Sequence, residues 1–251
     1  MTKDLFSTHS ELYQQARPQY SSEILDAILT YVPERELAWD CGAGSGQFTQ
    51  LLAPHFAQVL ATDLSERQLQ QAPVFANVRY LQAAAEHSHC APASVDLVCV
   101  AQAIHWFDFT TFYAEVKRVL KPKGVLAVIG YGLIQLQDVE LQHALQQLYF
   151  KTLQGYWDPE RRYIDEHYQT IPFPFQELAV PALALHYTWS STQLLQYLAT
   201  WSGVQHYQRQ HPQEDPLQEM RECLATKANP QVKLSFPVLL RVGRQAANKL
   251  A

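Results

Sequence analysis

The feature that most constrains the fold is an alternation, between residues 21 and about 130, of amphipathic stretches with short apolar runs. Short apolar runs are typical of strands covered on both faces, and the amphipathic stretches between them are typical of crossover helices. Strands are predicted at 37–40, 58–62, 78–82 and 95–100 and, after Gly124, up to residue 129. The sequence therefore predicts an α/β fold with a doubly wound, mostly parallel sheet.

The pattern changes after residue 131. Residues 149–175 carry eight aromatic side chains and three prolines, a composition typical of an insertion or cover. A proline in the last apolar run, Pro237, favours an edge strand or a bulge there. Helices are predicted at 21–32, 45–52, 66–71, 109–120, 192–201 and 216–227, and further strands at 182–189 and 232–242.

The length of 251 residues suits one elaborated domain. We expect 1–251 to form that domain, with an N-terminal helical segment and a helical, aromatic cover. The expected parts are a core at about 35–130, cover segments at about 1–30 and 131–230, and a final strand at about 231–243.

Composition excludes several classes of function. A net charge of -5 and 19 Lys and Arg residues provide no broad basic face, which disfavours nucleic acid as a partner. No apolar run approaches the roughly 20 residues of a membrane span, and no C-x-x-C pair is present, so a reducing, cytoplasmic location is expected. His87 and His89 lack further ligands at a plausible spacing, and no metal is predicted. The oligomeric state stays open.

A glycine-rich segment joins the first predicted strand to the first helix that follows it: Trp39-Asp40-Cys41-Gly42-Ala43-Gly44-Ser45-Gly46. Such glycines let a backbone turn tightly and approach a nucleotide-like ligand. Asp40 ends the strand, where a carboxylate would repel the pyrophosphate of a dinucleotide. A cofactor with a cationic head group and no phosphate resolves this conflict, and S-adenosylmethionine (SAM) has both an ammonium and a sulfonium.

Asp63 ends the second predicted strand, a position from which an acid can accept hydrogen bonds from ribose hydroxyls. Enzymes that use dinucleotides share this feature, so Asp63 supports an adenosyl cofactor without choosing between hydride and methyl transfer. The structural alternatives are an acid at the N-terminus of the next helix for Asp63 and an ordinary loop acid for Asp40. A nicotinamide-dependent oxidoreductase and a SAM-binding protein without catalysis remain alternative functions.

Five motifs in this order resemble those of class I SAM-dependent methyltransferases with a methyltransferase type 11 domain. They are Asp40 to Gly46, Asp63, Ala85-Glu86, Val95-Asp96-Leu97-Val98 and Leu120-Lys121-Pro122-Lys123-Gly124. The resemblance spans about 37–130 and implies a seven-stranded, Rossmann-like sheet whose last strand is antiparallel, with SAM across the carboxyl ends of the first strands. It also implies that Leu64 packs on adenine, that Ala85 and Glu86 lie by the adenine edge, and that Ala101 contacts the cofactor. For Leu64 the alternative is an ordinary core position.

Three further segments resemble the trans-aconitate methyltransferase-like branch: Arg17-Pro18-Gln19-Tyr20, Ala101-Gln102-Ala103-Ile104-His105-Trp106-Phe107 and Tyr197-Leu198-Ala199-Thr200-Trp201-Ser202. This branch includes carboxyl O-methyltransferases that act on small molecules. Ser21 departs from the pattern, since a proline often follows the tyrosine of the first segment. The resemblance implies methyl transfer to a small, anionic, carboxylate-bearing acceptor, with S-adenosylhomocysteine as the other product.

The candidate acceptor residues lie outside the cofactor motifs. His105 and Trp106 follow the fourth predicted strand, where switch-point geometry favours ligand contacts; the alternative is a buried aromatic pair that shapes the pocket. Arg17 and Tyr20 could close over the site or belong to a surface helix. Arg161 lies in the aromatic insertion and could contact an anion, or it could be a solvated loop residue.

Overall fold

Five parallel strands form the centre of the sheet, as the apolar runs predict. In a computed structural model that describes residues 17–245, the strands are β1 (Leu37–Cys41), β2 (Gln58–Asp63), β3 (Val78–Gln82), β4 (Val95–Ala101) and β5 (Leu120–Tyr131). Their order is β3-β2-β1-β4-β5, all parallel. The order reverses between β1 and β4, so their carboxyl ends form the crevice that such sheets use for ligands.

A long antiparallel strand, β9 (Gln231–Arg244), continues the sheet beyond β5. Its second half pairs with β5 and with β7 (Gln176–Leu178), while its first half pairs with β6 (Gln135–Leu136) and β8 (Ala184–Ser190). Residues 17–245 thus hold nine strands rather than the expected seven. The α/β class and the antiparallel last strand are confirmed. The strand predicted at 182–189 forms as β8, whereas the short strands β6 and β7 were not predicted and account for the difference.

The position of Pro237 differs from the sequence prediction. An edge strand is wrong, because β9 lies between β5 and its other partners. Pairing with β5 ends at Val238, and pairing with β8 begins at Pro237 itself. The carbonyl of Pro237 accepts from the Gly132 N–H at 2.9 Å. A residue without an N–H is accommodated where β9 changes partners, because no second ladder requires its donor.

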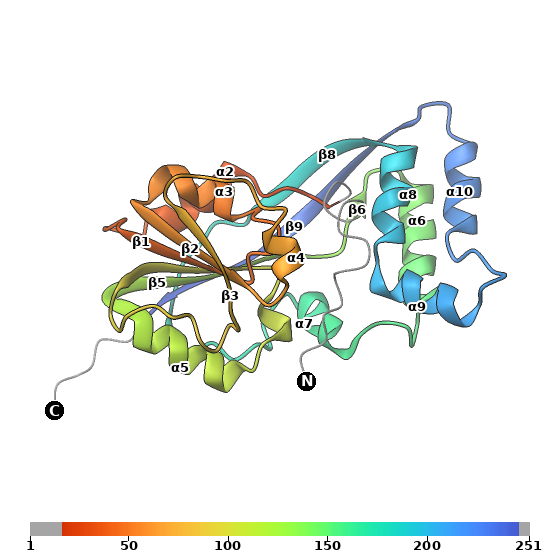
Figure 1. Cartoon of the computed structure of the whole chain (residues 1–251). Helices are drawn as coiled ribbons and strands as arrows, with labels where there is room; N and C mark the ends of the chain where they lie inside the picture. The colour runs from red at the N-terminus through yellow and green to blue at the C-terminus, as the bar shows by residue number, and fades with distance from the viewer. Residues whose placement is uncertain (1–16, 246–251) are drawn as a thin grey trace.

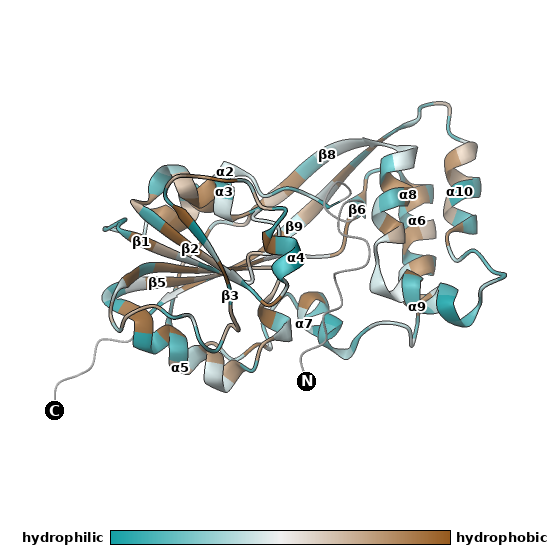
Figure 2. Ribbon diagram, in the orientation of Figure 1, coloured by the Kyte–Doolittle hydropathy of each residue, from teal (hydrophilic) through white to brown (hydrophobic). Residues whose placement is uncertain are grey.

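Successive side chains of the central strands pack alternately into two apolar cores, one on each face of the sheet. In β4, Leu97 and Cys99 join one core while Val98 and Val100 join the other. Helices α2 (Ser22–Leu29) and α3 (Thr49–Leu52) lie on one face of the sheet, and α5 (Phe109–Val119) lies on the other (Figure 1). Figure 2 shows hydrophobic residues along these strands and mixed faces on the helices. Both faces are covered, which is why the strands lack a polar alternation.

A second group of helices lies at the far end of β8 and β9 (Figure 1). It contains α6 (Val139–Gln147), α8 (Ser191–Ala199), α9 (Ser202–Gln210) and α10 (Gln218–Ala225). The sequence did not predict α9, whose Gly203 packs closely beneath Trp157. Within residues 17–245 no helix has the length and apolar character needed to cross a membrane.

Short helical turns connect these parts. They are η1 (Ala53–His55), α4 (Glu66–Leu69), η2 (Ile104–Trp106), the π-helical turn η3 (Leu148–Thr152), η4 (Pro159–Arg161) and α7 (Arg162–Asp165). The helix predicted at 45–52 begins only at Thr49, since the preceding glycines adopt left-handed backbone angles. Residues 1–16 of the predicted cover lie outside the described residues.

Candidate active site

The glycine-rich loop after β1 has a backbone that other residues adopt only at a cost. Gly42, Gly44 and Gly46 have φ values of 74°, 55° and 78°. The N–H groups of Gly42 and Ala43 both donate to the Thr62 carbonyl, at 2.8 and 2.9 Å. A Cβ atom on Gly42 would lie 2.6 Å from the Ala103 Cβ. The loop therefore needs glycine for its conformation and, at Gly42, also for space.

Asp40 places a buried carboxylate beneath this loop. Its side chain is fully buried, and the Thr49 hydroxyl donates to Oδ2 at 2.5 Å. Within residues 17–245 the other oxygen, Oδ1, is buried and has no hydrogen-bond partner. Burial, together with the nearby charge of Asp63, raises the pKa of Asp40 to about 7. A buried carboxyl group can ionise without a large free-energy cost only if a cationic or hydrogen-bonding partner contacts this oxygen.

Asp63, at the end of β2, connects two loops. Its Oδ2 accepts from the Gly44 N–H at 2.9 Å, and its Oδ1 accepts from the Ser65 N–H at 2.8 Å. The contacts show that Asp63 holds the glycine-rich loop in place.

A pocket opens at the carboxyl ends of β1, β2, β4 and β5. It is lined by the predicted residues Asp40, Gly42, Ala43, Gly44, Asp63, Ala101, Arg17, Tyr20 and Trp106. Ser45, Gln47, Phe48, Gln68, Gln102, Ala103 and Tyr131 also line it. Of these additional residues, Ser45 lies within the glycine-rich segment and Gln102 and Ala103 within the segment containing His105, so proximity in sequence could have indicated them. Phe48, Gln68 and Tyr131 carry no such signal.

The remaining predicted cofactor residues lie outside the lining of this pocket. Gly46 closes the glycine-rich loop, where its N–H donates to the Ala43 carbonyl at 2.9 Å. Leu64 is 49% exposed, so it is not an ordinary core residue. Ala85 is buried, and the Glu86 carboxylate accepts from the Asp108 N–H at 3.2 Å.

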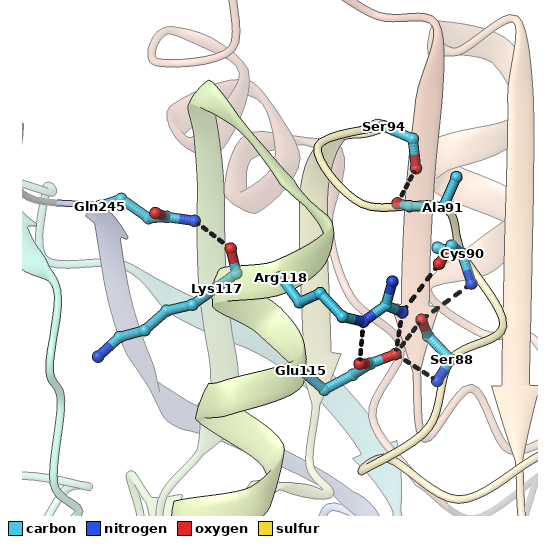
Figure 3. A network of polar contacts seen from close by, with 8 residues as sticks. All are labelled: Ser88, Cys90, Ala91, Ser94, Glu115, Lys117, Arg118 and Gln245. Carbon is cyan, nitrogen blue, oxygen red and sulfur yellow. Dashed lines mark hydrogen bonds and ion pairs between the residues drawn. The ribbon is translucent and has the colours of Figure 1, made fainter.

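An ionic network between the buried Glu115 and the exposed Arg118 holds the loop that carries Ala85 and Glu86 against α5 (Figure 3). Glu115 accepts from the Ser88 N–H at 2.8 Å and from the Ser88 hydroxyl at 2.6 Å. Arg118 donates to both Glu115 oxygens at 2.7 Å and to the Cys90 carbonyl at 2.8 Å. The bonds from Arg118 and Ser88 lower the pKa of Glu115 to about 2. The carboxylate is thus ionised at neutral pH and fixes this loop.

His105 is buried beside the pocket, and its neighbour Trp106 lines it. The centroid of the His105 ring lies 5.1 Å from that of the Trp106 ring and 6.2 Å from that of the Tyr168 ring. Burial and the charges of Arg161 and Arg17 lower the pKa of His105 to about 3. The imidazole is therefore neutral at physiological pH and interacts through hydrogen bonds rather than through charge.

Arg161 is not a solvated loop residue, because its side chain is only 17% exposed. Its Nε donates to the Tyr149 hydroxyl at 2.8 Å and lies 3.5 Å from Asp165 Oδ1. The guanidinium lies over the rings of Tyr149 and Trp157, at 5.4 and 5.3 Å from their centroids. Tyr149 itself belongs to the π-helical turn, an irregularity frequent at functional sites.

The first described residues also reach the pocket. Arg17 donates to the Tyr131 hydroxyl at 3.2 Å and lies 5.7 Å from the Tyr197 ring centroid. The ring of Tyr20 contacts the ring of Phe48 edge to face, with 5.4 Å between the ring centroids. Arg17 and Tyr20 therefore line the pocket beside Tyr131, at the end of β5.

Comparison with known proteins shows to which family this chain belongs. The methyltransferase domain family matches residues 39–128. A Dictyostelium discoideum protein named as a methyltransferase is 36% identical over 226 residues, which cover 88% of this chain and 85% of that protein. This chain belongs to the methyltransferase family.

Two further relatives agree with this assignment. A solved structure described as a type II methyltransferase from Anaeromyxobacter dehalogenans is 38% identical, with a TM-score of 0.84 over 91% of this chain and 97% of that one. A Saccharomyces cerevisiae protein named as a SAM-dependent methyltransferase is 28% identical over 158 residues, or 59% of this chain and 53% of its own. The protein is a SAM-dependent methyltransferase.

The pocket of this methyltransferase fits SAM. Asp40 Oδ1 is a buried acceptor with no hydrogen-bond partner within residues 17–245, and the methionyl ammonium of SAM supplies both hydrogens and positive charge. Gly42 and Gly44 have no side chain that would fill the approach to this oxygen. Among residues 17–245, no group of His, Cys, Asp and Glu side chains could hold a metal ion.

Proposed function

We propose that this methyltransferase transfers the methyl group of SAM to a small, anionic, carboxylate-bearing acceptor. One observation carries the proposal: Arg17 lines the pocket, and the largely buried Arg161, from a distant segment, lies close enough to His105 beside the pocket to lower its pKa together with Arg17. Burying cationic groups is costly unless an anion or hydrogen-bond acceptor compensates. Asp165, the ion-pair partner of Arg161, is 42% exposed and also accepts from Tyr149. A bound carboxylate would add to this compensation.

The proposed cofactor contacts follow the predicted residues. Asp40 accepts from the ammonium of SAM, and the loop of Gly42, Ala43, Gly44 and Gly46 lets the methionyl part approach the backbone. Asp63 accepts from the ribose hydroxyls. The remaining proposed contacts, around adenine and beside β4, are Leu64, Ala85, Glu86 and Ala101.

The proposed acceptor contacts are Arg17, Tyr20, His105, Trp106 and Arg161. When bound, SAM supplies an electrophilic methyl group on a sulfonium. A carboxylate acceptor is ionised at neutral pH, so the protein needs no base and mainly orients the acceptor and excludes water. Arginine suits this task because its planar guanidinium can donate two parallel hydrogen bonds to a carboxylate.

We also propose that 1–251 form one functional domain, in which about 35–130 bind the cofactor and about 1–30 and 131–230 supply the cover and the acceptor contacts. The contacts of Arg17 with Tyr131 and of Tyr187 with the Gln19 carbonyl support this division. The three segments that resemble the trans-aconitate methyltransferase-like branch support the same class of acceptor.

The test is a methyl-transfer assay with methyl-labelled SAM and paired acceptors, in which each small carboxylic acid is matched by its neutral amide. We expect labelled methyl ester from one or more acids and none from the amides. Arg161→Gln should raise the KM for an active acid about tenfold or more, the effect of losing a charge-assisted hydrogen bond, while leaving the Kd for SAM unchanged.

The matched control is the neighbouring exposed arginine. Arg162 donates to the Tyr163 hydroxyl and lies over that ring, so Arg162→Gln should leave KM unchanged. Equal methylation of acids and amides, or equal KM values in the two variants, would refute the anionic acceptor.

A further inference from the structure

Tyr168 brings a buried phenol from the predicted cover to the residues that follow β4. The residue is fully buried, and its hydroxyl lies 3.0 Å from Gln102 Oε1 and 3.3 Å from His105 Nδ1. Gly130 makes room for it, because a Cβ atom there would lie 2.6 Å from the Tyr168 ring. A residue distant in sequence thus contacts both the pocket residue Gln102 and the candidate acceptor residue His105.

The backbone around this phenol is strained and firmly supported. Gln102, His167 and Tyr168 have φ values of 56°, 53° and 60°, which are costly for residues other than glycine. Arg241 donates to the carbonyls of Tyr168 and Ile171 at 2.9 and 2.8 Å. Strain of this kind persists only where the surroundings enforce it, and it is found mostly at functional sites.

Glu177 completes this support. It accepts from Arg241 at 2.8 and 3.1 Å, which anchors the arginine to β7. The contact joins the cover segment, through β7 and β9, to the central sheet. The position of the phenol is therefore set by the sheet and not by its own loop alone.

The hydrogen bonds fix the direction of the phenol proton. Gln102 Nε2 donates to the Tyr131 carbonyl at 3.4 Å, which turns Oε1 toward Tyr168. A carbonyl oxygen can only accept, so the single phenol proton is used on Gln102. The Tyr168 oxygen can then only accept from His105, whose Nδ1 must carry a hydrogen. Within residues 17–245, His105 Nε2 has no hydrogen-bond partner.

We propose that Tyr168 is a positioning residue that, together with Gln102, holds His105 in the tautomer with its hydrogen on Nδ1 and leaves Nε2 as a hydrogen-bond acceptor for the methyl acceptor. The proposal rests on the proposed function in placing the acceptor beside His105. It adds that the acceptor presents an N–H or O–H group to His105, besides the negative charge that faces the arginines.

The test reads the tautomer directly in the whole protein, without acceptor or SAM. Long-range hydrogen–nitrogen correlation spectra of protein labelled with nitrogen-15 histidine show which ring nitrogen carries the hydrogen, and His105→Gln assigns the signals. We expect the Nδ1–H form in the parent. In Tyr168→Phe the acceptor for Nδ1–H is lost, and the two ring-nitrogen signals should shift toward a mixture of tautomers.

A second variant should move the signals in a defined direction. Gln102→Met removes the acceptor that uses the phenol proton, so Tyr168 can donate to His105 and the Nε2–H form should predominate. Tyr113→Phe is the matched control, because the Tyr113 hydroxyl donates to the Pro172 carbonyl of the same cover segment at 2.5 Å without contacting His105. It should leave the His105 signals unchanged.

Two results would overturn the proposal: the Nε2–H form in the parent, or unchanged His105 signals in both Tyr168→Phe and Gln102→Met. If Tyr168→Phe fails to fold, Gln102→Met still decides the question. Because no acceptor is used, failure of the methyl-transfer assay does not affect this result. A correct tautomer with no carboxylic acid methylated would refute the acceptor class alone.

Discussion

The two halves of the proposed site, residues 37–131 and residues 133–183, are built from different kinds of contact. In the first, the glycine-rich loop and the carboxylates of Asp40 and Asp63 line the pocket beside larger side chains such as Phe48 and Trp106. In the second, long side chains carry the contacts, as in the cluster of Arg161, Tyr149 and Trp157. A backbone loop tolerates few substitutions, whereas an aromatic cluster can be rearranged. This difference suits a common cofactor and variable acceptors.

The largest expected effect comes from two glycines, one in each half. Gly42 and Gly155 both have left-handed φ values, of 74° and 84°. A Cβ atom at Gly42 would lie 2.6 Å from Ala103, whereas one at Gly155 would meet nothing within 4 Å. Gly155→Ala should cost about 1–2 kcal/mol of unfolding free energy from backbone strain alone. Gly42→Ala should cost about 1–3 kcal/mol more from overpacking.

Chemical denaturation of both variants measures these costs, and calorimetric titration with S-adenosylhomocysteine measures binding. We expect weaker binding only in Gly42→Ala. Equal losses of stability and of binding in the two variants would show that the loop after β1 is no more constrained than the cover.

The next effect concerns Asp40. Asp40→Asn should weaken SAM binding about tenfold or more, since a charge-assisted contact worth about 1.5–3 kcal/mol is reduced. The affinity of the parent should fall as the pH drops below about 7, the pKa of Asp40, because the protonated carboxyl no longer attracts the ammonium. Asp40→Asn should lose this pH dependence. A folded variant with unchanged affinity would contradict the assignment.

Asp40→Asn should weaken SAM binding but stabilise the cofactor-free protein against unfolding, relative to the parent, as the pH rises. The pKa of Asp40 is raised from 3.8 to about 7 in the folded protein, so the folded state binds more protons than the unfolded state between these values. The contribution of Asp40 to stability therefore decreases as pH rises from about 4 to 7. We expect Asp40→Asn to become progressively more stable than the parent over this range, as measured by denaturant unfolding. Asp215→Asn, in an exposed ion pair with Arg221, is the control.

The smallest effect distinguishes a mobile cover from a permanent one. We predict that 133–180, with the N-terminal segment 1–20, close over the acceptor, because long proline-broken insertions are often lids and methyl transfer benefits from excluding water. Hydrogen exchange should slow about tenfold in both segments when S-adenosylhomocysteine binds. Equal, high protection with and without it would instead indicate an aromatic core packed permanently on the sheet.

Much of the cofactor half could be predicted because its determinants are local. The apolar runs of β1 to β5 reflect burial on both faces, and the loop of Gly42 to Gly46 follows directly from β1. Less of the cover could be predicted. Its composition indicated a separate segment, but not that Arg161 would be buried against Tyr149, nor that α9 would form beneath Trp157.

The sequence by itself determined the α/β class, the parallel strands at the centre of the sheet and the residues at the carboxyl ends of β1 and β2. These features could be predicted because strand periodicity and turn chemistry act over a few residues. Only the tertiary structure decided that Tyr168 reaches Gln102 across 66 positions of the chain, or that Arg241 holds its carbonyl across 73. These contacts depend on how β9 carries the cover back to the sheet. No local pattern encodes them, since burial and hydrogen bonding between distant segments arise only once the sheet is assembled.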